Sequence, residues 1–500
     1  MTPLTLTPEA FRAIGHRLVD DLARQLAAMP AGPVTRDERP SEVRAALGAD
    51  APLPEHGRDA SALVAEATER LFAHALFNGH PRFWGYITSS PAPIGVLGDL
   101  LASALNQNVG AWTLSPGATE IEAQVIRWIG AFLGYPAGAG GLLVSGGNMA
   151  NLVCLLAARA AKAPWDVRAE GAMPAGRGRL RIYASTETHT WLQKAADIMG
   201  LGTDAIRWIA VDGAQRIDVA ALERALVADR AAGDIPCAVI GTAGTVSTGA
   251  VDPLPALARL CRAHDVWFHV DGAYGALAAA VPGAPADLAA LAAADSVAVD
   301  PHKWLYAPLE AGCALVRSPE ALRAAFAYHP AYYHFDEAAT NYFDHGPQNS
   351  RGFRALKVWL AFQQAGASGY RALIADDLRR ARLLADLIEA DTDLALLTQH
   401  LSITTFRYVP AELVSRQGEP AVAAWLDQVN RALLDTLQRG GELFVSNAVV
   451  DGRYALRACF VNFQTTDDDV RAVPAIVVRH ARALDRATRP EVLRPAAVPE

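Results

Sequence analysis

The sequence lacks the features that mark several large classes of protein. Its 500 residues carry no basic excess, since the formal net charge is -8, whereas nucleic-acid-binding proteins usually gather basic residues on one face. The first residues, up to Leu26, contain neither the basic start nor the apolar run of a secretory signal. We therefore expect no nucleic-acid partner and a cytoplasmic location.

A long uninterrupted apolar run is also missing. The most suggestive stretch, Ala276–Ala294, is rich in alanine but contains Pro282, Pro285 and Asp287. Prolines and a carboxylate are poorly tolerated in a helix that faces lipid. The sequence therefore predicts no membrane span.

Cysteines are few and scattered, and no two of them form a C-x-x-C pair. An odd number of dispersed cysteines argues against a disulfide framework and against a zinc site, and fits a reducing compartment. We expect them to be small core residues and predict no bound metal. They are Cys154, Cys237, Cys261, Cys313 and Cys459.

The N-terminal segment has helical patterns but too little apolar sequence for a core of its own. Thr7 precedes a proline and a glutamate, which is a favourable helix start. A proline-rich stretch, Pro30–Pro54, separates this helix from a second helical pattern over Ala60–Leu76. We predict that residues 1–85 form a helical segment that packs on another surface.

Short apolar runs alternate with helical segments over residues 86–365. Successive apolar residues are typical of strands buried on both faces, and alternation with helices predicts a mostly parallel sheet. This α/β region is the predicted large domain. The expected strands are Leu142–Val144, Leu180–Tyr183, Ile206–Val211, Cys237–Ile240, Val266–Val270, Val297–Val299 and Ala314–Val316.

The pattern changes over residues 366–500, where helices and strands no longer alternate regularly. We expect a strand at Ser402–Tyr408, a helix at Ala421–Arg439, and strands at Leu443–Val449 and Tyr454–Asn462. Such an order predicts a small C-terminal α+β domain.

A lysine and an aspartate follow two of the expected strands. Lys303 lies in the sequence D-P-H-K-W, and Asp271 lies in H-V-D-G-A-Y. A buried ammonium is costly to desolvate, so each residue could also be half-exposed or part of a structural ion pair. Because ligand sites of α/β sheets gather at the carboxyl ends of strands, we expect both side chains in one crevice.

Two further strand ends complete the pattern. Gly146 and Gly147 form a turn into a helix, where free backbone N–H groups can bind a phosphate. The turn matches neither the dinucleotide-binding nor the nucleoside-triphosphate motif. His189 also follows a strand, and its ring could stack on a heteroaromatic cofactor. An amine, a carboxylate, a phosphate cradle and a stacking ring are what pyridoxal phosphate (PLP) requires.

The motifs together resemble the group II PLP-dependent amino-acid decarboxylases, which include the aromatic L-amino acid, glutamate and histidine decarboxylases. The likeness extends from about His80 to the C-terminus, and its most specific piece is D-P-H-K-W. It implies the PLP-dependent transferase fold of type I, a seven-stranded large domain, and a homodimer with its active sites at the interface.

The resemblance also implies roles for individual residues. Lys303 would hold PLP as a Schiff base, Asp271 would pair with the pyridine nitrogen, and His189 would stack on the ring. A catalytic tyrosine, Tyr332, would return a proton to the substrate carbon, although Tyr333 beside it is chemically identical. The remaining cofactor contacts would be Ala273, Gly147, Asn148, His302, Asp300 and Thr245.

Substrate choice is the least constrained part of the prediction. Asn108 and Gly110 occupy positions that are apolar and bulky in the aromatic enzymes, yet aromatic residues nearby favour an aromatic substrate. Production of an aldehyde, and decarboxylation of glutamate or 2,4-diaminobutyrate, remain alternatives. The expected substrate-binding residues are Trp84, Tyr86, Thr88, Trp112, Leu309 and Arg351.

Overall fold

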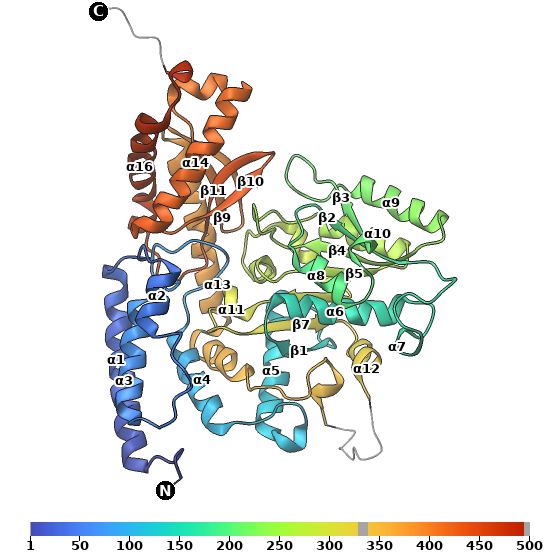
Figure 1. The fold of residues 1–500 in the computed structure, drawn as a ribbon. Coiled ribbons are helices and arrows are strands. Elements are labelled where there is room, and N and C mark those ends of the chain that lie inside the picture. Colours follow the sequence, from blue (N-terminus) through green and yellow to red (C-terminus); the bar gives the residue numbers. More distant parts are fainter. Residues whose placement is uncertain (1, 329–338, 495–500) are drawn as a thin grey trace, which may run out of the picture.

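A seven-stranded sheet forms the core of the larger lobe of the molecule (Figure 1) in the computed structural model, which describes residues 2–328 and 339–494. Its strand order is β1-β7-β6-β5-β4-β2-β3. All neighbouring pairs are parallel except those of β7, which is antiparallel to both β1 and β6. The predicted mostly parallel sheet is confirmed. The strands are β1 (Gly140–Val144), β2 (Leu180–Ser185), β3 (Ile206–Ile209), β4 (Ile235–Thr242), β5 (Trp267–Asp271), β6 (Ser296–Val299) and β7 (Gly312–Val316).

Helices connect these strands and cover the sheet. Most strand residues are buried, which explains why the strands appear in the sequence as continuous apolar runs. The connection from β6 to β7 contains only one short helix, which suits an antiparallel pair. The helices of this region are α4 (Pro93–Leu105), α5 (Pro116–Leu133), α6 (Gly147–Lys162), α7 (Val167–Glu170), α8 (Trp191–Ile198), α9 (Val219–Ala231), α10 (Leu254–Ala263), α11 (Pro301–Trp304) and α12 (Glu320–Phe326).

Three helices precede this region and lie along one side of the molecule (Figure 1). They are α1 (Pro8–Ala28), α2 (Pro40–Leu47) and α3 (Ala60–Ala73), and none of them contains a fully buried residue. The Thr7 hydroxyl accepts a hydrogen bond from the backbone N–H of Ala10, at 3.1 Å, as the predicted cap of α1. These helices therefore leave apolar side chains facing solvent in the single chain.

The long helix α13 (Ala355–Glu389) joins the large sheet to the C-terminal part (Figure 1). Its path is interrupted at Gly366, whose φ of 64° and ψ of 170° are not helical. As far as Leu378 the helix packs on α4, α5 and the core of the large sheet, and from Ala381 onward it packs on the C-terminal sheet.

The C-terminal sheet is antiparallel, with the strand order β10-β11-β9-β8. Its helices cover one side and bury a second apolar core, separate from the core of the large sheet. The elements are β8 (Leu394–His400), β9 (Ile403–Tyr408), α14 (Pro420–Gly440), β10 (Ser446–Val450), β11 (Arg453–Cys459), α15 (Asp467–Arg471) and α16 (Val473–Thr488).

Two features of the C-terminal part differ from the sequence prediction. Strand β8 was not predicted, because its residues follow the long helix directly and show no clear polar–apolar alternation. Residues 443–445, predicted as the start of a strand, pair instead with residues 82–84: Phe444 N donates to Arg82 O, and Trp84 N donates to Phe444 O. The N-terminal segment is thus attached to the C-terminal sheet.

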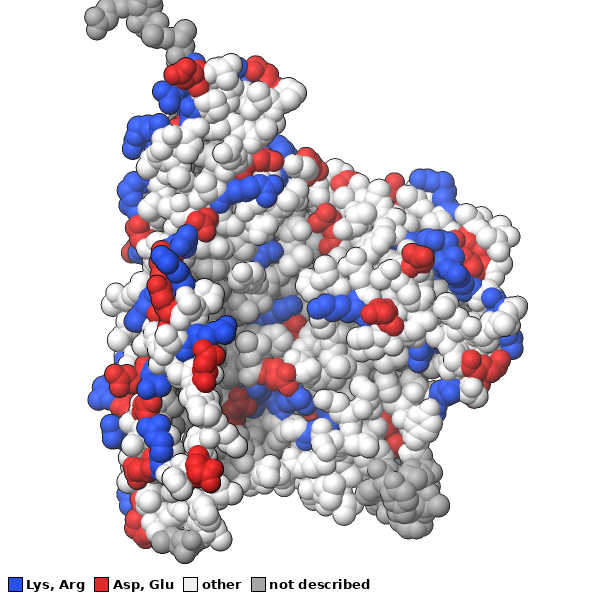
Figure 2. All heavy atoms as spheres, in the orientation of Figure 1, with Lys and Arg blue, Asp and Glu red and all other residues white. Residues whose placement is uncertain are grey.

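Charges of both signs are interspersed over the face shown in Figure 2, which is hollowed between the N- and C-terminal parts and the lobe of the large sheet. All five cysteines are buried and unpaired with one another, as predicted. Across residues 2–328 and 339–494, no helix has the length and apolar character needed to cross a bilayer.

Candidate active site

The ends of several strands of the large sheet meet at one cavity of about 470 Å³. Parallel strands present their carboxyl ends at the same edge, so the residues that follow them converge. Ten of the predicted site residues line this cavity: Tyr86, Gly147, Asn148, His189, Asp271, Ala273, Asp300, His302, Lys303 and Leu309.

Lys303 lies on the short helix α11, directly after β6. Its Nζ atom is 3.1 Å from Oδ2 of Asp300, and the same oxygen is 3.6 Å from Nε2 of His302. Asp300 is only 2% exposed, so its carboxylate balances the cationic amine in a largely dry environment. Lys303 is the one lysine of the chain on the cavity wall; the others are Lys162, Lys194 and Lys357.

The glycine turn between β1 and α6 forms another wall of the cavity. Gly146 has φ 147° and ψ -179°, a backbone conformation that is essentially restricted to glycine. A Cβ atom on Gly147 would lie 2.7 Å from Oδ2 of Asp300 and 3.1 Å from Cβ of Ala273. The backbone is therefore exposed to the cavity at the N-terminus of a helix, which is suited to an anion.

Asp271 ends β5 and is 7% exposed. Its Oδ2 accepts a hydrogen bond of 2.6 Å from the indole Nε1 of Trp191, and its Oδ1 accepts one of 3.2 Å from the backbone N of Ala273. These donors fix the orientation of the carboxylate. Trp191 was not predicted to belong to the site. Its indole reaches Asp271 from helix α8, and the two residues are 80 positions apart in the chain.

His189 precedes α8, and its Nδ1 accepts a hydrogen bond of 3.2 Å from the backbone N of Trp191. Acceptance at Nδ1 places the proton of the neutral ring on Nε2. Burial lowers the pKa of His189 below its usual value, despite the opposing effect of Asp271. The ring is thus neutral near pH 7 and available for stacking.

Arg457 on β11 of the C-terminal sheet also lines the cavity, although no sequence pattern predicted it. Its side chain is buried, and it donates to the carbonyl oxygen of Val246. Within the described part of the chain, no carboxylate is paired with its guanidinium, and its Nε atom has no hydrogen-bond partner. Burial lowers its pKa. A ligand with a negative charge would satisfy this group.

Arg351, predicted to bind substrate, does not reach the cavity. It forms a fully buried ion pair with Glu122 and donates to the carbonyl oxygens of Val109 and Leu143, each at 2.7 Å. The Tyr342 ring lies 4.7 Å from its guanidinium. Its hydrogen bonds thus go to the protein interior.

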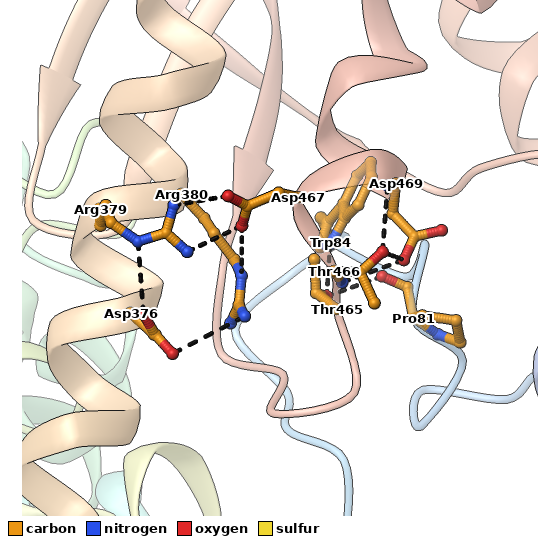
Figure 3. A network of polar contacts seen from close by, with 9 residues as sticks. All are labelled: Pro81, Trp84, Asp376, Arg379, Arg380, Thr465, Thr466, Asp467 and Asp469. Carbon is orange, nitrogen blue, oxygen red and sulfur yellow. Dashed lines mark hydrogen bonds and ion pairs between the residues drawn. The ribbon is translucent and has the colours of Figure 1, made fainter.

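Trp84 also lies away from the cavity, in the core of the C-terminal part. Its Nε1 donates to Oγ1 of Thr465 at 3.0 Å, and Thr465 in turn donates to the carbonyl oxygen of Pro81 at 2.7 Å (Figure 3). The same view shows Asp467 of α15 bonded to Arg379 of α13. Trp84 therefore joins the N-terminal segment to the C-terminal core.

The other predicted residues lie near the cavity or outside the described residues. Thr245 is fully buried and bonds Thr248 at 2.9 Å, although Gly244 and Val246 on either side line the cavity. Thr88 lines an adjoining space of about 260 Å³ that shares His302 and Leu309 with it. Trp112 is exposed and bonds Glu120 at 3.0 Å. Tyr332 and Tyr333 lie outside the described residues.

Three independent observations indicate that the cavity can hold PLP. A glycine turn offers backbone N–H groups to a phosphate, a buried carboxylate is oriented by two donors, and one lysine is present. Asp300 Oδ1 and Thr242 Oγ1 are buried cavity-wall atoms without a partner among the described residues. In the described part of the chain, no group of three or more possible metal ligands competes with this assignment.

Comparison with known proteins agrees with this chemistry. A model of the pyridoxal-dependent decarboxylase conserved domain matches residues 40–409. The aromatic-L-amino-acid decarboxylase of Bacillus atrophaeus is 34% identical over 472 residues, which cover 93% of this chain and 94% of the relative. A phenylacetaldehyde synthase of Rosa hybrid cultivar is 28% identical over 492 residues, covering 96% and 95%.

A solved structure, Oryza sativa TDC with PLP and tryptamine, superposes with a TM-score of 0.88. It is 27% identical and covers 97% of this chain and 99% of its own. The fold, the cavity and the extent of these matches lead to one conclusion: the chain belongs to the pyridoxal-dependent decarboxylase family and is a PLP-dependent enzyme of that family.

Proposed function

We propose that this enzyme removes the α-carboxyl group of an aromatic L-amino acid as carbon dioxide and releases the corresponding amine. The observation that carries the proposal is the convergence of Lys303, Asp271 and the Gly146–Gly147 turn on one cavity. The amino-acid decarboxylases of similar sequence, with the relative from Bacillus atrophaeus first among them, support the same reaction.

Each of the cavity residues has a separate task in this proposal. Lys303 would anchor the cofactor through Nζ, Asp271 would hold a proton on the ring nitrogen, and His189 would cover the ring. The free backbone N–H groups near Gly147 would bind the phosphate. When bound, PLP supplies an electron sink for the bond that breaks at the α-carbon.

The remaining walls support an aromatic side chain over a cationic one. Apolar groups dominate there, namely Tyr86, Ile87, Met149, Val246 and Leu309. Asp271 already accepts two hydrogen bonds, and Lys303 balances the charge of Asp300, although Asp300 Oδ1 has no partner among the described residues. No second buried carboxylate is therefore left over on the described cavity wall to balance an ammonium group of 2,4-diaminobutyrate. An aromatic ring can pack on the apolar wall without leaving a buried charge unpaired.

Arg457 favours a second candidate, decarboxylation of glutamate. Its guanidinium lies on the cavity wall without a carboxylate partner among the described residues, so it could bind a side-chain carboxylate. In the aromatic case the same group would bind the α-carboxylate and orient the substrate. The two candidates thus assign one residue to two different carboxylates.

A panel of L-amino acids separates these candidates. We expect carbon dioxide and an amine from tyrosine, 3,4-dihydroxyphenylalanine, tryptophan or phenylalanine, and little from glutamate or 2,4-diaminobutyrate. Aldehyde, ammonia and peroxide in place of amine would instead identify an aldehyde synthase. Turnover of glutamate alone would instead support the second candidate, glutamate decarboxylation.

The proposal extends to assembly and location. Helix α4 exposes Leu97, Leu100, Leu101 and Leu105 on one face, each about half accessible in the single chain. Monomeric proteins rarely expose such a continuous apolar face, and a second copy of the chain related by two-fold symmetry would cover it. Five buried cysteines without a disulfide support a cytoplasmic location, which fractionation of the producing cells would test.

A further inference from the structure

Trp191 contacts two of the groups assigned to the cofactor at once. It is the first residue of α8 and is 2% exposed. Its indole Nε1 donates to Oδ2 of Asp271 at 2.6 Å, while its backbone N donates to Nδ1 of His189 at 3.2 Å. The same residue therefore restrains a carboxylate from β5 and a ring that follows β2.

The indole bond determines how the Asp271 carboxylate faces the cavity. Trp191 donates to one oxygen and the backbone N of Ala273 to the other, so the carboxylate cannot rotate without losing a bond. Hydrogen bonds to an ionised group are stronger than those between neutral groups. Without the indole donor, Asp271 would be partly unsatisfied in a buried position and free to turn.

Trp191 itself is held by a rigid neighbour. His269 of β5 lies edge-on to its ring, with centroids 6.1 Å apart and an interplanar angle of 84°. The His269 ring bonds Oγ of Ser296 at 2.8 Å and Oδ1 of Asn151 on α6 at 2.7 Å. Burial lowers the pKa of His269 to about 4, so this ring is neutral near pH 7. Through Asn151, the His269 ring is therefore connected to α6, the helix that begins at the glycine turn.

We propose that Trp191 is a positioning residue, which holds the Asp271 carboxylate and the His189 ring in the geometry that binds the cofactor ring. The inference rests on the proposed assignment of Asp271 and His189 to the cofactor. A tryptophan that merely fills space would act through its volume, whereas the contact with Asp271 depends on the indole N–H; the contact with His189 comes from the backbone and is kept when the side chain is changed. A variant that lacks the N–H but keeps an aromatic ring therefore distinguishes hydrogen bonding from space filling.

The chain offers a matched control in Trp267, at the start of β5. This tryptophan is also buried, and its Nε1 donates to Oγ of Ser296 at 2.8 Å, but it does not line the cavity. Trp191→Phe and Trp267→Phe therefore remove the same atoms from similar environments. Any difference between the two variants in cofactor binding reports the contact with Asp271.

The experiment titrates each cofactor-free protein with PLP and records the dissociation constant and the visible circular dichroism of the bound cofactor. Loss of a hydrogen bond to a charged group predicts about tenfold weaker binding or more for Trp191→Phe, with a changed dichroism band. Trp267→Phe should stay within about threefold of the wild type and keep its band. Equal effects of the two variants, or wild-type behaviour of Trp191→Phe, would overturn the inference.

Asp271→Asn distinguishes failure of this inference from failure of the proposed site. If Asp271→Asn binds PLP as the wild type does, the site assignment is wrong; if it does not and Trp191→Phe does, only the role of Trp191 is wrong. Should Trp191→Phe fail to fold, Trp191→His keeps a ring N–H donor and Trp191→Leu does not. Tighter PLP binding by the histidine variant supports the inference, and equal binding refutes it.

Discussion

Among single residues, Arg457 is a buried charge whose contacts are incomplete. It comes from the second sheet and donates to the carbonyl oxygen of Val246, yet no described carboxylate is paired with it. We predict that Arg457→Met raises KM for the amino acid roughly tenfold to a hundredfold, because a charge-assisted hydrogen bond is lost. Steady-state kinetics of both proteins measure this change in KM.

The control for that prediction is Arg453→Met on the same strand. Arg453 is exposed and lies 3.5 Å from Asp451, away from the cavity. Its loss should leave KM unchanged. An unchanged KM in Arg457→Met as well would show that the guanidinium has only a structural role.

Tyr332 gives a second residue-scale prediction. If it returns the proton to the α-carbon, Tyr332→Phe should still release carbon dioxide but yield less amine and more aldehyde, because oxygen can intercept the unprotonated carbon. Tyr333→Phe is the matched control and should make amine normally. The measurement is the ratio of amine to aldehyde with and without oxygen. Wild-type amine production by Tyr332→Phe would assign the role to another residue.

Residues differ in how well the sequence reveals them. Lys303, Asp271 and Gly147 could be predicted because each follows a strand, and parallel strands end at one edge. Trp191 and Arg457 could not, because their contacts depend on the packing of segments far apart in the chain. Trp84 is a residue that was predicted wrongly. Aromatic residues close to it in the sequence favoured a place in the substrate pocket, but it lies in the C-terminal core, where it donates a hydrogen bond to Thr465.

Among the elements, the turn between β1 and α6 has no room for a side chain. Gly147→Ala would place a methyl group 2.7 Å from Asp300 Oδ2. Overpacking of this kind costs about 1–3 kcal/mol, so we expect PLP affinity to fall roughly fivefold to a hundredfold. Gly138→Ala, where no atom lies within 4 Å of the added Cβ, should bind PLP normally. Equal affinities of the two variants would argue against the turn as the phosphate site.

Helix α13 contributes a buried carboxyl group behind the lysine turn. Asp377 accepts hydrogen bonds from Trp304 Nε1 at 2.9 Å and from Tyr306 Oη at 2.7 Å, and burial raises its pKa to about 7. A carboxyl group whose pKa is higher in the folded state stabilises the fold fully below its unfolded value. That contribution is lost as the pH rises from about 4 to about 7.

The variant Asp377→Asn tests this titration. A shift of about three pKa units corresponds to at most about 4 kcal/mol in the free energy of unfolding. We expect the stability of the wild type relative to Asp377→Asn to fall between pH 5 and pH 7 and then to level off. Urea midpoints at several pH values measure it, with Asp376→Asn on the exposed side as control. Parallel profiles for wild type and Asp377→Asn would contradict the raised pKa.

The elements also show what the sequence could and could not predict. All seven strands of the large sheet were predicted within a few residues, because burial on both faces produces continuous apolar runs. Strand β8 was missed, since it lies beside β9 with mostly half-buried residues. The division at residues 85 and 365 stays a prediction; Gly366 interrupts α13 beside the second boundary, and residues 82–84 pair with the C-terminal part.

For the whole molecule, the apolar face of α4 predicts a dimer. We expect light scattering to give twice the chain mass of 53.1 kDa. Leu97→Glu together with Leu101→Glu should yield a monomer, because two charges would then be buried at the interface. Ile198→Glu, at an exposed apolar residue of α8, should remain a dimer. A dimeric double variant would place the interface elsewhere.

Lys303 is expected to hold PLP, and the small number of lysines in the chain allows a direct test. Only Lys162, Lys194 and Lys357 compete, and Lys162 and Lys357 are paired with Asp265 and Asp99. The measurement is borohydride reduction of the yellow protein, followed by peptide mapping of the pyridoxyl label. We expect the label on Lys303 and none in Lys303→Ala; a label on any other lysine of the wild type would show that Lys303 does not hold PLP.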